Sequence, residues 1–206
     1  MASLFPLFLK LEGRRCLVVG AGAVAESKIA SLVAAGATVH VVAPRASEAV
    51  TSLARARKIA WSARPFERRD LAGKFLVVVA TADPKLNKRV FEEARQGRVL
   101  ANVVDDPQHC DFYYPAVVQR GDLEIAISTN GHSPALAQRL KREIEQQFPP
   151  EYAEWLKDLG QQRRKLFARK MDHERRRRTL HRMATRERFE AFARGERRKA
   201  GGTRAR

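Results

Sequence analysis

Residues 16–28 read CLVVGAGAVAESK, and this stretch decides the fold. The apolar residues at its start predict a short buried strand, and the residues from Ala23 onward predict a helix. Between them lies Gly20-Ala21-Gly22-Ala23-Val24-Ala25, a G-x-G-x-x-A pattern. Glycines at such a turn let the backbone approach a pyrophosphate, whose charge meets the N-terminus of the helix. The position between a strand and a helix favours a dinucleotide site over a purely structural glycine turn.

The alternation of apolar and helix-like stretches continues over residues 14–104 and predicts a parallel sheet with helices between its strands. Each predicted strand is short, and most of the helices between them end near a glycine or a polar residue. We expect strands at residues 16–19, 38–42, 59–61, 75–80 and 99–104, and helices at 23–35, 47–57 and 83–96. These five strands predict an α/β Rossmann-type domain over residues 1–113.

The pattern changes after this domain. Strand-like runs at 114–118 and 123–128, separated by Arg120-Gly121-Asp122, predict a hairpin, and a helix is expected from Ala135 to Gln147. Together they form a small α+β segment over residues 114–148. The remainder, residues 149–206, is predicted to be a basic helical domain: a helix over 151–193 that bends at Gly160, then a frayed tail.

The positive charge of the chain is concentrated near its end. The formal net charge is +17, and residues 161–206 contain 18 Lys and Arg against 5 Asp and Glu, a net of +13. This tail includes Arg175-Arg176-Arg177-Arg178. A solvated helix face is one interpretation, and contact with an anionic ligand or with nucleic acid is the other.

Several classes of protein do not fit the composition. The two cysteines, Cys16 and Cys110, are too few for a disulfide scaffold and lack a metal-binding spacing. The N-terminus has no signal-peptide pattern, and no apolar run approaches the roughly 20 residues of a membrane span. We therefore expect a cytoplasmic protein with no membrane segment.

The loop after the second predicted strand indicates whether the cofactor is NAD or NADP. An acidic residue usually stands there and binds the ribose hydroxyls, but this strand runs into Ala43-Pro44-Arg45. Arg45 suggests a 2′-phosphate, and hence NADP. A solvated arginine beside a ribose held by backbone groups is the other interpretation.

Two further segments are candidates for chemistry. Asn102-Val103-Val104-Asp105-Asp106 stands at the carboxyl end of a predicted parallel strand, where ligands bind in open α/β sheets. Its carboxylates suit acid–base work or a metal ion, although an Asx turn before Pro107 explains them equally well. The loop from Ser128 to Ser133 precedes the N-terminus of a predicted helix, which favours binding of substrate carboxylates. For His132 in this loop, a solvated side chain is the simpler interpretation.

Taken together, these motifs resemble one family, the precorrin-2 dehydrogenases, which also form the N-terminal module of siroheme synthases. The resemblance covers about residues 3–150 and rests on five motifs in order. They are LFPLFL at 4–9, CLVVGAGAVAESK at 16–28, NVVDD at 102–106, FYYPA at 112–116 and STNGHSPALA at 128–137. The family often has glycine, then lysine or threonine, where this chain has Asn130 and His132.

The resemblance implies an activity, a cofactor and a set of site residues. The activity is NAD-dependent dehydrogenation of precorrin-2, an octacarboxylate tetrapyrrole, to sirohydrochlorin, and some members also insert ferrous iron into sirohydrochlorin. Asp105 would be the catalytic general base. By the resemblance, NAD would contact Ala23, Val24, Pro44 and Arg45, in addition to Gly20 and Gly22 of the turn motif. Our candidates for substrate binding, from the residues themselves, are Asn102, Ser128, Thr129, His132 and Ser133.

The resemblance further implies a homodimer, with residues 114–148 as the dimerisation segment. No metal ligands are assigned, because Asp105, His109 and His132 show no diagnostic spacing. The alternative function is an NAD(H)-sensing module that acts through its basic tail on nucleic acid or on a protein partner. A nucleic-acid partner is not expected, since no helix-turn-helix pattern is evident.

Overall fold

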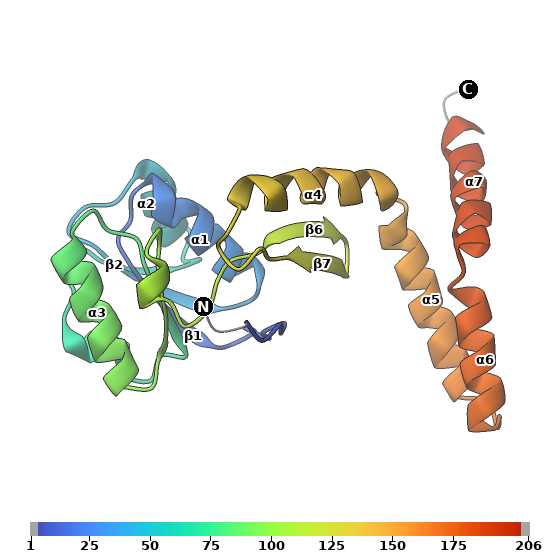
Figure 1. Cartoon of the computed structure of the whole chain (residues 1–206), viewed down its shortest axis with the longest axis horizontal. Coiled ribbons are helices and arrows are strands. Elements are labelled where there is room, and N and C mark those ends of the chain that lie inside the picture. Colours follow the sequence, from blue (N-terminus) through green and yellow to red (C-terminus); the bar gives the residue numbers. More distant parts are fainter. Residues whose placement is uncertain (1–3, 203–206) are drawn as a thin grey trace. The chain divides into compact units, whose positions relative to one another are not determined.

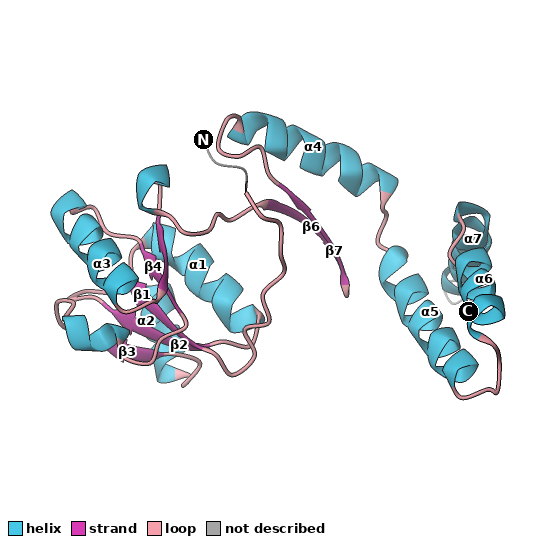
Figure 2. Ribbon diagram, turned by 60° about the horizontal axis from the view of Figure 1, so that its bottom comes forward, coloured by secondary structure: helices cyan, strands magenta, loops and turns pink. Residues whose placement is uncertain are grey.

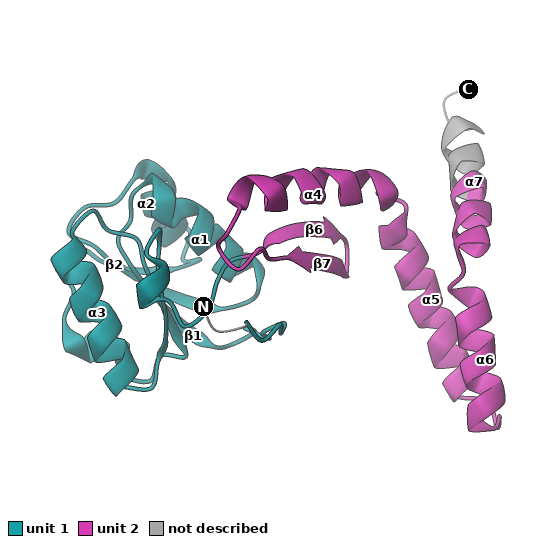
Figure 3. Ribbon diagram, in the orientation of Figure 1, with its two compact units in different colours: residues 1–114 teal, residues 115–206 magenta. Residues whose placement is uncertain are grey.

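The structure, a computed structural model, describes the backbone of residues 4–202 and the side chains of residues 4–195. It consists of two compact units, Met1–Tyr114 and Pro115–Arg206 (Figure 3). Each unit has its own arrangement of helices and strands. The division of the chain into three segments remains a prediction.

The first unit contains a five-stranded parallel sheet (Figure 2). Its strands are β1 (Arg15–Val19), β2 (Thr38–Val42), β3 (Ala60–Ser62), β4 (Leu76–Val79) and β5 (Leu100–Val103). Their order is β3-β2-β1-β4-β5, so the chain reverses its direction of travel across the sheet after β3. The predicted α/β Rossmann-type sheet is confirmed. Its switch point lies between β1 and β4, where such folds bind ligands.

Helices cover both faces of this sheet. They are α1 (Ala23–Ala34), α2 (Glu48–Arg55) and α3 (Pro84–Gln96), with short 3-10 helices η1 (Arg68–Leu71) and η2 (Pro107–His109). The side chains of α1 and α2 share a buried cluster with Val18, whereas those of α3 share another with Leu17. Successive strand residues face opposite sides. Burial on both sides explains why β4 is apolar throughout and why most residues of β1 are apolar.

The second unit begins with the predicted hairpin. Strands β6 (Ala116–Arg120) and β7 (Leu123–Ile127) pair antiparallel, and α4 (Pro134–Gln147) follows them (Figure 1). Ser133 caps α4, since its hydroxyl accepts a hydrogen bond from the N–H of Leu136 at 3.2 Å. The guanidinium of Arg120 donates to two carbonyls at the end of α4. These contacts join the hairpin to the helix.

The predicted long helix over 151–193 is wrong. Three helices take its place, α5 (Tyr152–Phe167), α6 (His173–Met183) and α7 (Arg186–Gly202). Gly160 lies within α5 and does not bend it. A glycine costs a helix only about 1 kcal/mol, which packing offsets. The chain turns instead at residues 168–172.

Local hydrogen bonds and aromatic contacts explain where the helices begin and how they pack. The carboxylate of Asp172 accepts from the N–H of Arg175 at 2.9 Å and starts α6. The ring of Phe189 on α7 stacks on Tyr152 of α5 at 3.9 Å between centroids, so α7 packs against α5. Helix α7 continues to Gly202, past the predicted start of the frayed tail. Residues 203–206 of that tail lie outside the described residues.

A histidine on β2 makes the stability of the first unit dependent on pH. Burial, and next the positive charge of Lys74, lower the pKa of His40 below its ordinary value of 6.5. The folded protein therefore keeps His40 neutral where the unfolded chain binds a proton. We expect the free energy of unfolding to fall as the pH drops below about 6.5.

The variant His40→Gln tests this expectation, because glutamine retains a partner for the Ser62 hydroxyl, now 2.9 Å from the imidazole. Its urea midpoint should change less than that of the wild type between about pH 7.5 and about pH 5.5. An equal pH dependence in both proteins would contradict the role of His40.

Asp70 makes stability sensitive to acid only at lower pH. Burial alone would raise its pKa, but hydrogen bonds from Arg64 and the Glu67 backbone lower the pKa below 3.8.

Candidate functional site

The carboxyl ends of three neighbouring strands meet at one edge of the sheet. Val19, Val79 and Val103 are paired in register at the ends of β1, β4 and β5. The glycine turn follows the first of these strands, and Asp105 follows the last, so both leave the same edge. The structure thus brings the predicted cofactor turn and the predicted base to one side of the sheet.

The two glycines of the turn have different roles. Gly20 has φ +105°, and a Cβ atom there would overlap the carbonyl group of Ala80, the residue that follows β4. Gly22 has an ordinary φ of −87°, and a Cβ atom there would meet nothing within 4 Å. Gly20 is therefore required by the fold itself. Gly22 keeps open the space in front of α1.

The N-terminus of α1 fits a dinucleotide phosphate. No side chain caps this helix, whereas Ser47 caps α2 and Asp83 caps α3. Its first N–H groups, which have no partner within the helix, border the space kept open at Gly22. The side chain of Val24 in this first turn is 52% exposed. Free N–H donors, the positive end of the helix dipole and an open approach are what a pyrophosphate needs.

The second predicted cofactor segment lies beside the glycine turn. The backbone N–H of Ser47 donates to the carbonyl of Ala21 at 3.0 Å. The N–H of Gly20 donates to the carbonyl of Val42, also at 3.0 Å. The exposed Pro44-Arg45 pair lies in the loop between these two contacts. The two segments are therefore adjacent, and a contact between Pro44-Arg45 and the cofactor remains a prediction.

Of the two adjacent aspartates, Asp105 has the more available carboxylate. The carboxylate of Asp106 contacts the imidazole of His109 at 2.7 Å. Asp105 is exposed, and none of the described side chains donates a hydrogen bond to it. Its φ of +60° is rare for a residue other than glycine and holds it at the tip of the turn after β5. Its geometry suits a group that takes a proton from a ligand.

Sequence reasoning missed Lys28, whose charge interacts with that of Asp105, and Tyr114, whose ring contacts Lys28. The ammonium of Lys28 lies over the ring of Tyr114, 4.0 Å from its centroid. Burial lowers the pKa of Lys28, and the neighbouring charge of Asp105 opposes this shift. Burial also raises the pKa of Tyr114 to about 12. The spacing in the sequence could have identified Lys28, because it follows Val24 by four residues and so lies on the same face of α1.

Asn102 is buried within the first unit, with 6% of its surface exposed. Its amide donates to the carbonyl of Phe112 at 2.8 Å and contacts the Sγ of Cys110 at 3.3 Å. These bonds hold the segment after β5 against the sheet and so support the turn that carries Asp105. A contact between Asn102 and the substrate remains a prediction.

The predicted substrate loop belongs to the second unit. The hydroxyl of Thr129 bonds to the backbone N–H and carbonyl of Ser133, and Ser128 accepts from the N–H of Asn130 at 3.1 Å. The hydroxyls thus shape the loop, and the side chain of His132 is exposed on it. Roles of these residues in substrate binding remain predictions.

Within the described part of the chain, no group of three or more His, Cys, Asp or Glu residues is placed to hold a metal ion. Cys16 and Cys110 are both free thiols. As for membranes, the described helices include none with the length and apolar character that a bilayer crossing requires.

Two family models match the chain. The model described as "Putative NAD(P)-binding" matches residues 7–116, and the one described as "Sirohaem biosynthesis protein central" matches residues 120–147. The first covers the parallel sheet and the site. The second covers β7, α4 and the loop between them.

Curated relatives and a solved structure are also similar to this chain. A siroheme synthase of Neisseria meningitidis (strain FAM18) is 40% identical over 159 residues, 77% of this chain and 33% of the relative. Siroheme synthase 3 of Aeromonas hydrophila is 38% identical over 192 residues, 93% of this chain and 41% of the relative. The chain thus spans about a third to two fifths of these relatives. The structure of "SirC, precorrin-2 dehydrogenase" matches with a TM-score of 0.77 and 26% identity, covering 93% of this chain and 98% of that one.

Proposed function

This chain belongs to the NAD(P)-binding family matched over residues 7–116, and we propose that it catalyses the NAD-dependent dehydrogenation of precorrin-2 to sirohydrochlorin in siroheme biosynthesis. One observation carries the proposal. The glycine turn before α1, a helix that no side chain caps, and the exposed carboxylate of Asp105 lie at the same edge of one parallel sheet. The similarity to siroheme synthases and to a precorrin-2 dehydrogenase names the substrate.

The reaction removes a hydride and a proton from the substrate and extends its conjugation by one double bond. NAD, when bound, would supply the acceptor for the hydride. The N–H groups of Ala23 and Val24 would hold the pyrophosphate, and the loop at Pro44-Arg45 would border the ribose. Asp105 would accept the proton, and the ammonium of Lys28 beside it offers a charge for a substrate carboxylate.

We also propose a homodimer and a cytoplasmic location. A two-stranded hairpin such as β6–β7 is only marginally stable by itself, and most of its residues are partly or fully exposed, so it would gain from a second copy. The two free thiols suit a reducing compartment. Ferrous iron insertion into sirohydrochlorin remains a prediction from the resemblance.

The test is an anaerobic assay with purified protein, NAD and precorrin-2. We expect sirohydrochlorin absorbance and NADH to appear together in equal amounts. Protein that binds NAD but forms neither product, while a known enzyme forms both, would refute the proposal. The sensing alternative would instead show DNA retention that responds to the NADH/NAD ratio.

The side chain of Arg45 tests the choice between NAD and NADP. Arg45 is exposed in the loop beside the glycine turn, and we infer that its guanidinium would bind the 2′-phosphate of NADP. We expect Arg45→Ala to weaken NADP binding about tenfold and to change NAD binding by less than about twofold. Isothermal titration with both cofactors measures this. An equal loss for both would place Arg45 at a group that the two cofactors share.

A further inference from the structure

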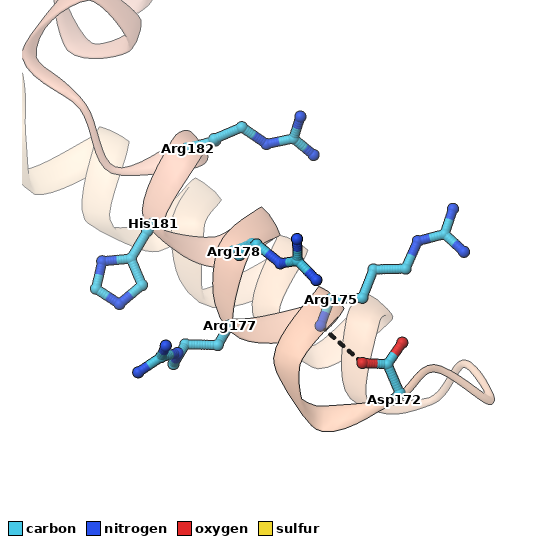
Figure 4. A pocket seen from close by; sticks show the side chains of 6 residues that line it. All are labelled: Asp172, Arg175, Arg177, Arg178, His181 and Arg182. Carbon is cyan, nitrogen blue, oxygen red and sulfur yellow. Dashed lines mark hydrogen bonds between the residues drawn. The ribbon is translucent and has the colours of Figure 1, made fainter.

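Helix α6 carries a dense group of arginines in the second unit. Arg175, Arg177, Arg178 and Arg182 extend from it, together with His181, and we call these five residues the arginine face (Figure 4). With Asp172 they line an open hollow of about 810 Å³. That volume lies within the range of small-molecule sites.

Arg176, next to these residues in sequence, contacts other parts of the protein. Its Nη2 donates to the carbonyl of Met171 at 2.8 Å, and its guanidinium lies 4.6 Å from the centroid of the Phe167 ring. Phe167 is the last residue of α5, so Arg176 joins α6 to α5. These contacts hold α6 against α5, and Arg176 is not among the residues that line the hollow.

The arginine face has little compensating negative charge among the described residues. Asp172 is used to cap α6 through its bond to the Arg175 N–H. Glu174 lies 3.8 Å from Arg178, but both side chains are 69% exposed, and an ion pair of this kind contributes little. The arginine face is therefore a surface that an anionic partner would stabilise.

The shape and chemistry of the hollow indicate what the partner is. A guanidinium matches a carboxylate through two parallel hydrogen bonds. Arg175 and Arg182 are seven residues apart, which at 1.5 Å per residue is about 10 Å along the helix. A rigid ligand that engages both would carry several anionic groups spaced apart, as a polycarboxylate does. No Phe, Tyr or Trp lines the hollow, so it lacks the stacking platform of single-stranded nucleic acid sites.

We propose that the arginine face is a binding site for a polycarboxylate tetrapyrrole, held by charge-assisted hydrogen bonds to several of its carboxylates. The ligand class follows from the proposed function, on which this inference rests. The arginine face would collect the substrate by electrostatic attraction and raise its concentration near the protein.

The experiment titrates the full chain with uroporphyrin I, a stable octacarboxylate porphyrin, without NAD. The triple variant Arg175→Gln, Arg178→Gln, Arg182→Gln removes three charges from the arginine face. We expect its Kd to rise about tenfold or more at about 50 mM salt. The matched control Arg186→Gln, Arg188→Gln, Arg194→Gln removes the same formal charge from α7 and should stay within about twofold of the wild type.

Three outcomes would overturn the proposal: an unchanged Kd in the α6 variant, an equal loss in both variants, or tighter binding of a duplex DNA than of uroporphyrin I at the same salt. The titration needs no turnover, so it remains informative if the proposed function fails. If dehydrogenation is observed, the α6 variant should raise the KM for precorrin-2 more than it lowers kcat. An unchanged KM would show that the arginine face does not serve the substrate.

Discussion

The variant Asp105→Asn should lower kcat for precorrin-2 dehydrogenation about a thousandfold, because an amide cannot accept the proton that the carboxylate takes. Asparagine has nearly the same shape and tolerates the left-handed φ of +60° found at this position. The turn after β5 should therefore persist. Single-turnover formation of NADH measures the loss, and NADH fluorescence should show an unchanged Kd for the cofactor.

Asp106→Asn is the matched control for this prediction. It removes a charge of the same kind one residue away, but from a carboxylate that contacts His109 at 2.7 Å. We expect a small loss of thermal stability and a kcat within about threefold of the wild type. If both variants lost activity equally, the turn as a whole and not the Asp105 carboxylate would be required. If Asp105→Asn also lost cofactor binding, its role would be structural.

The second large effect is expected at Gly22. The variant Gly22→Val places a branched side chain in the space that a pyrophosphate would occupy, and its own backbone φ of −87° suits any residue. Nothing within 4 Å of the new Cβ opposes it in the protein itself. We expect cofactor affinity to fall about a hundredfold, with a Tm close to that of the wild type. Calorimetric titration and thermal unfolding measure the two quantities.

The variant Gly20→Ala should instead lower the stability of the fold. Its Cβ would overlap the carbonyl group of Ala80, and φ +105° is strained for any side chain. We expect the Tm to fall by several degrees, as a loss of a few kcal/mol predicts for a chain of this length. If Gly22→Val unfolded the protein as readily as Gly20→Ala, the turn would be structural and the cofactor assignment would lose its support.

Much of the fold was predictable because its signals are local. The strand expected at 38–42 has the bounds of β2, and the other strands of the parallel sheet differ by one or two residues. Apolar runs, glycines and capping residues act within a few positions, so the alternation of strands and helices follows from short stretches. The prediction failed in the C-terminal helices, where the contact between Tyr152 and Phe189 joins residues far apart in the chain.

In the candidate site, too, some features follow from local sequence and others from long-range packing. The stretch from Cys16 to Lys28 by itself determined a strand, a glycine turn and a helix, because backbone freedom and hydrophobic pattern are properties of neighbouring residues. Only the tertiary structure separated Gly20, which must avoid the Ala80 carbonyl, from Gly22, which leaves space open. It likewise placed the ammonium of Lys28 near the exposed carboxylate of Asp105, which lies far along the chain. Each of these depends on how the chain packs, which short-range sequence patterns do not encode.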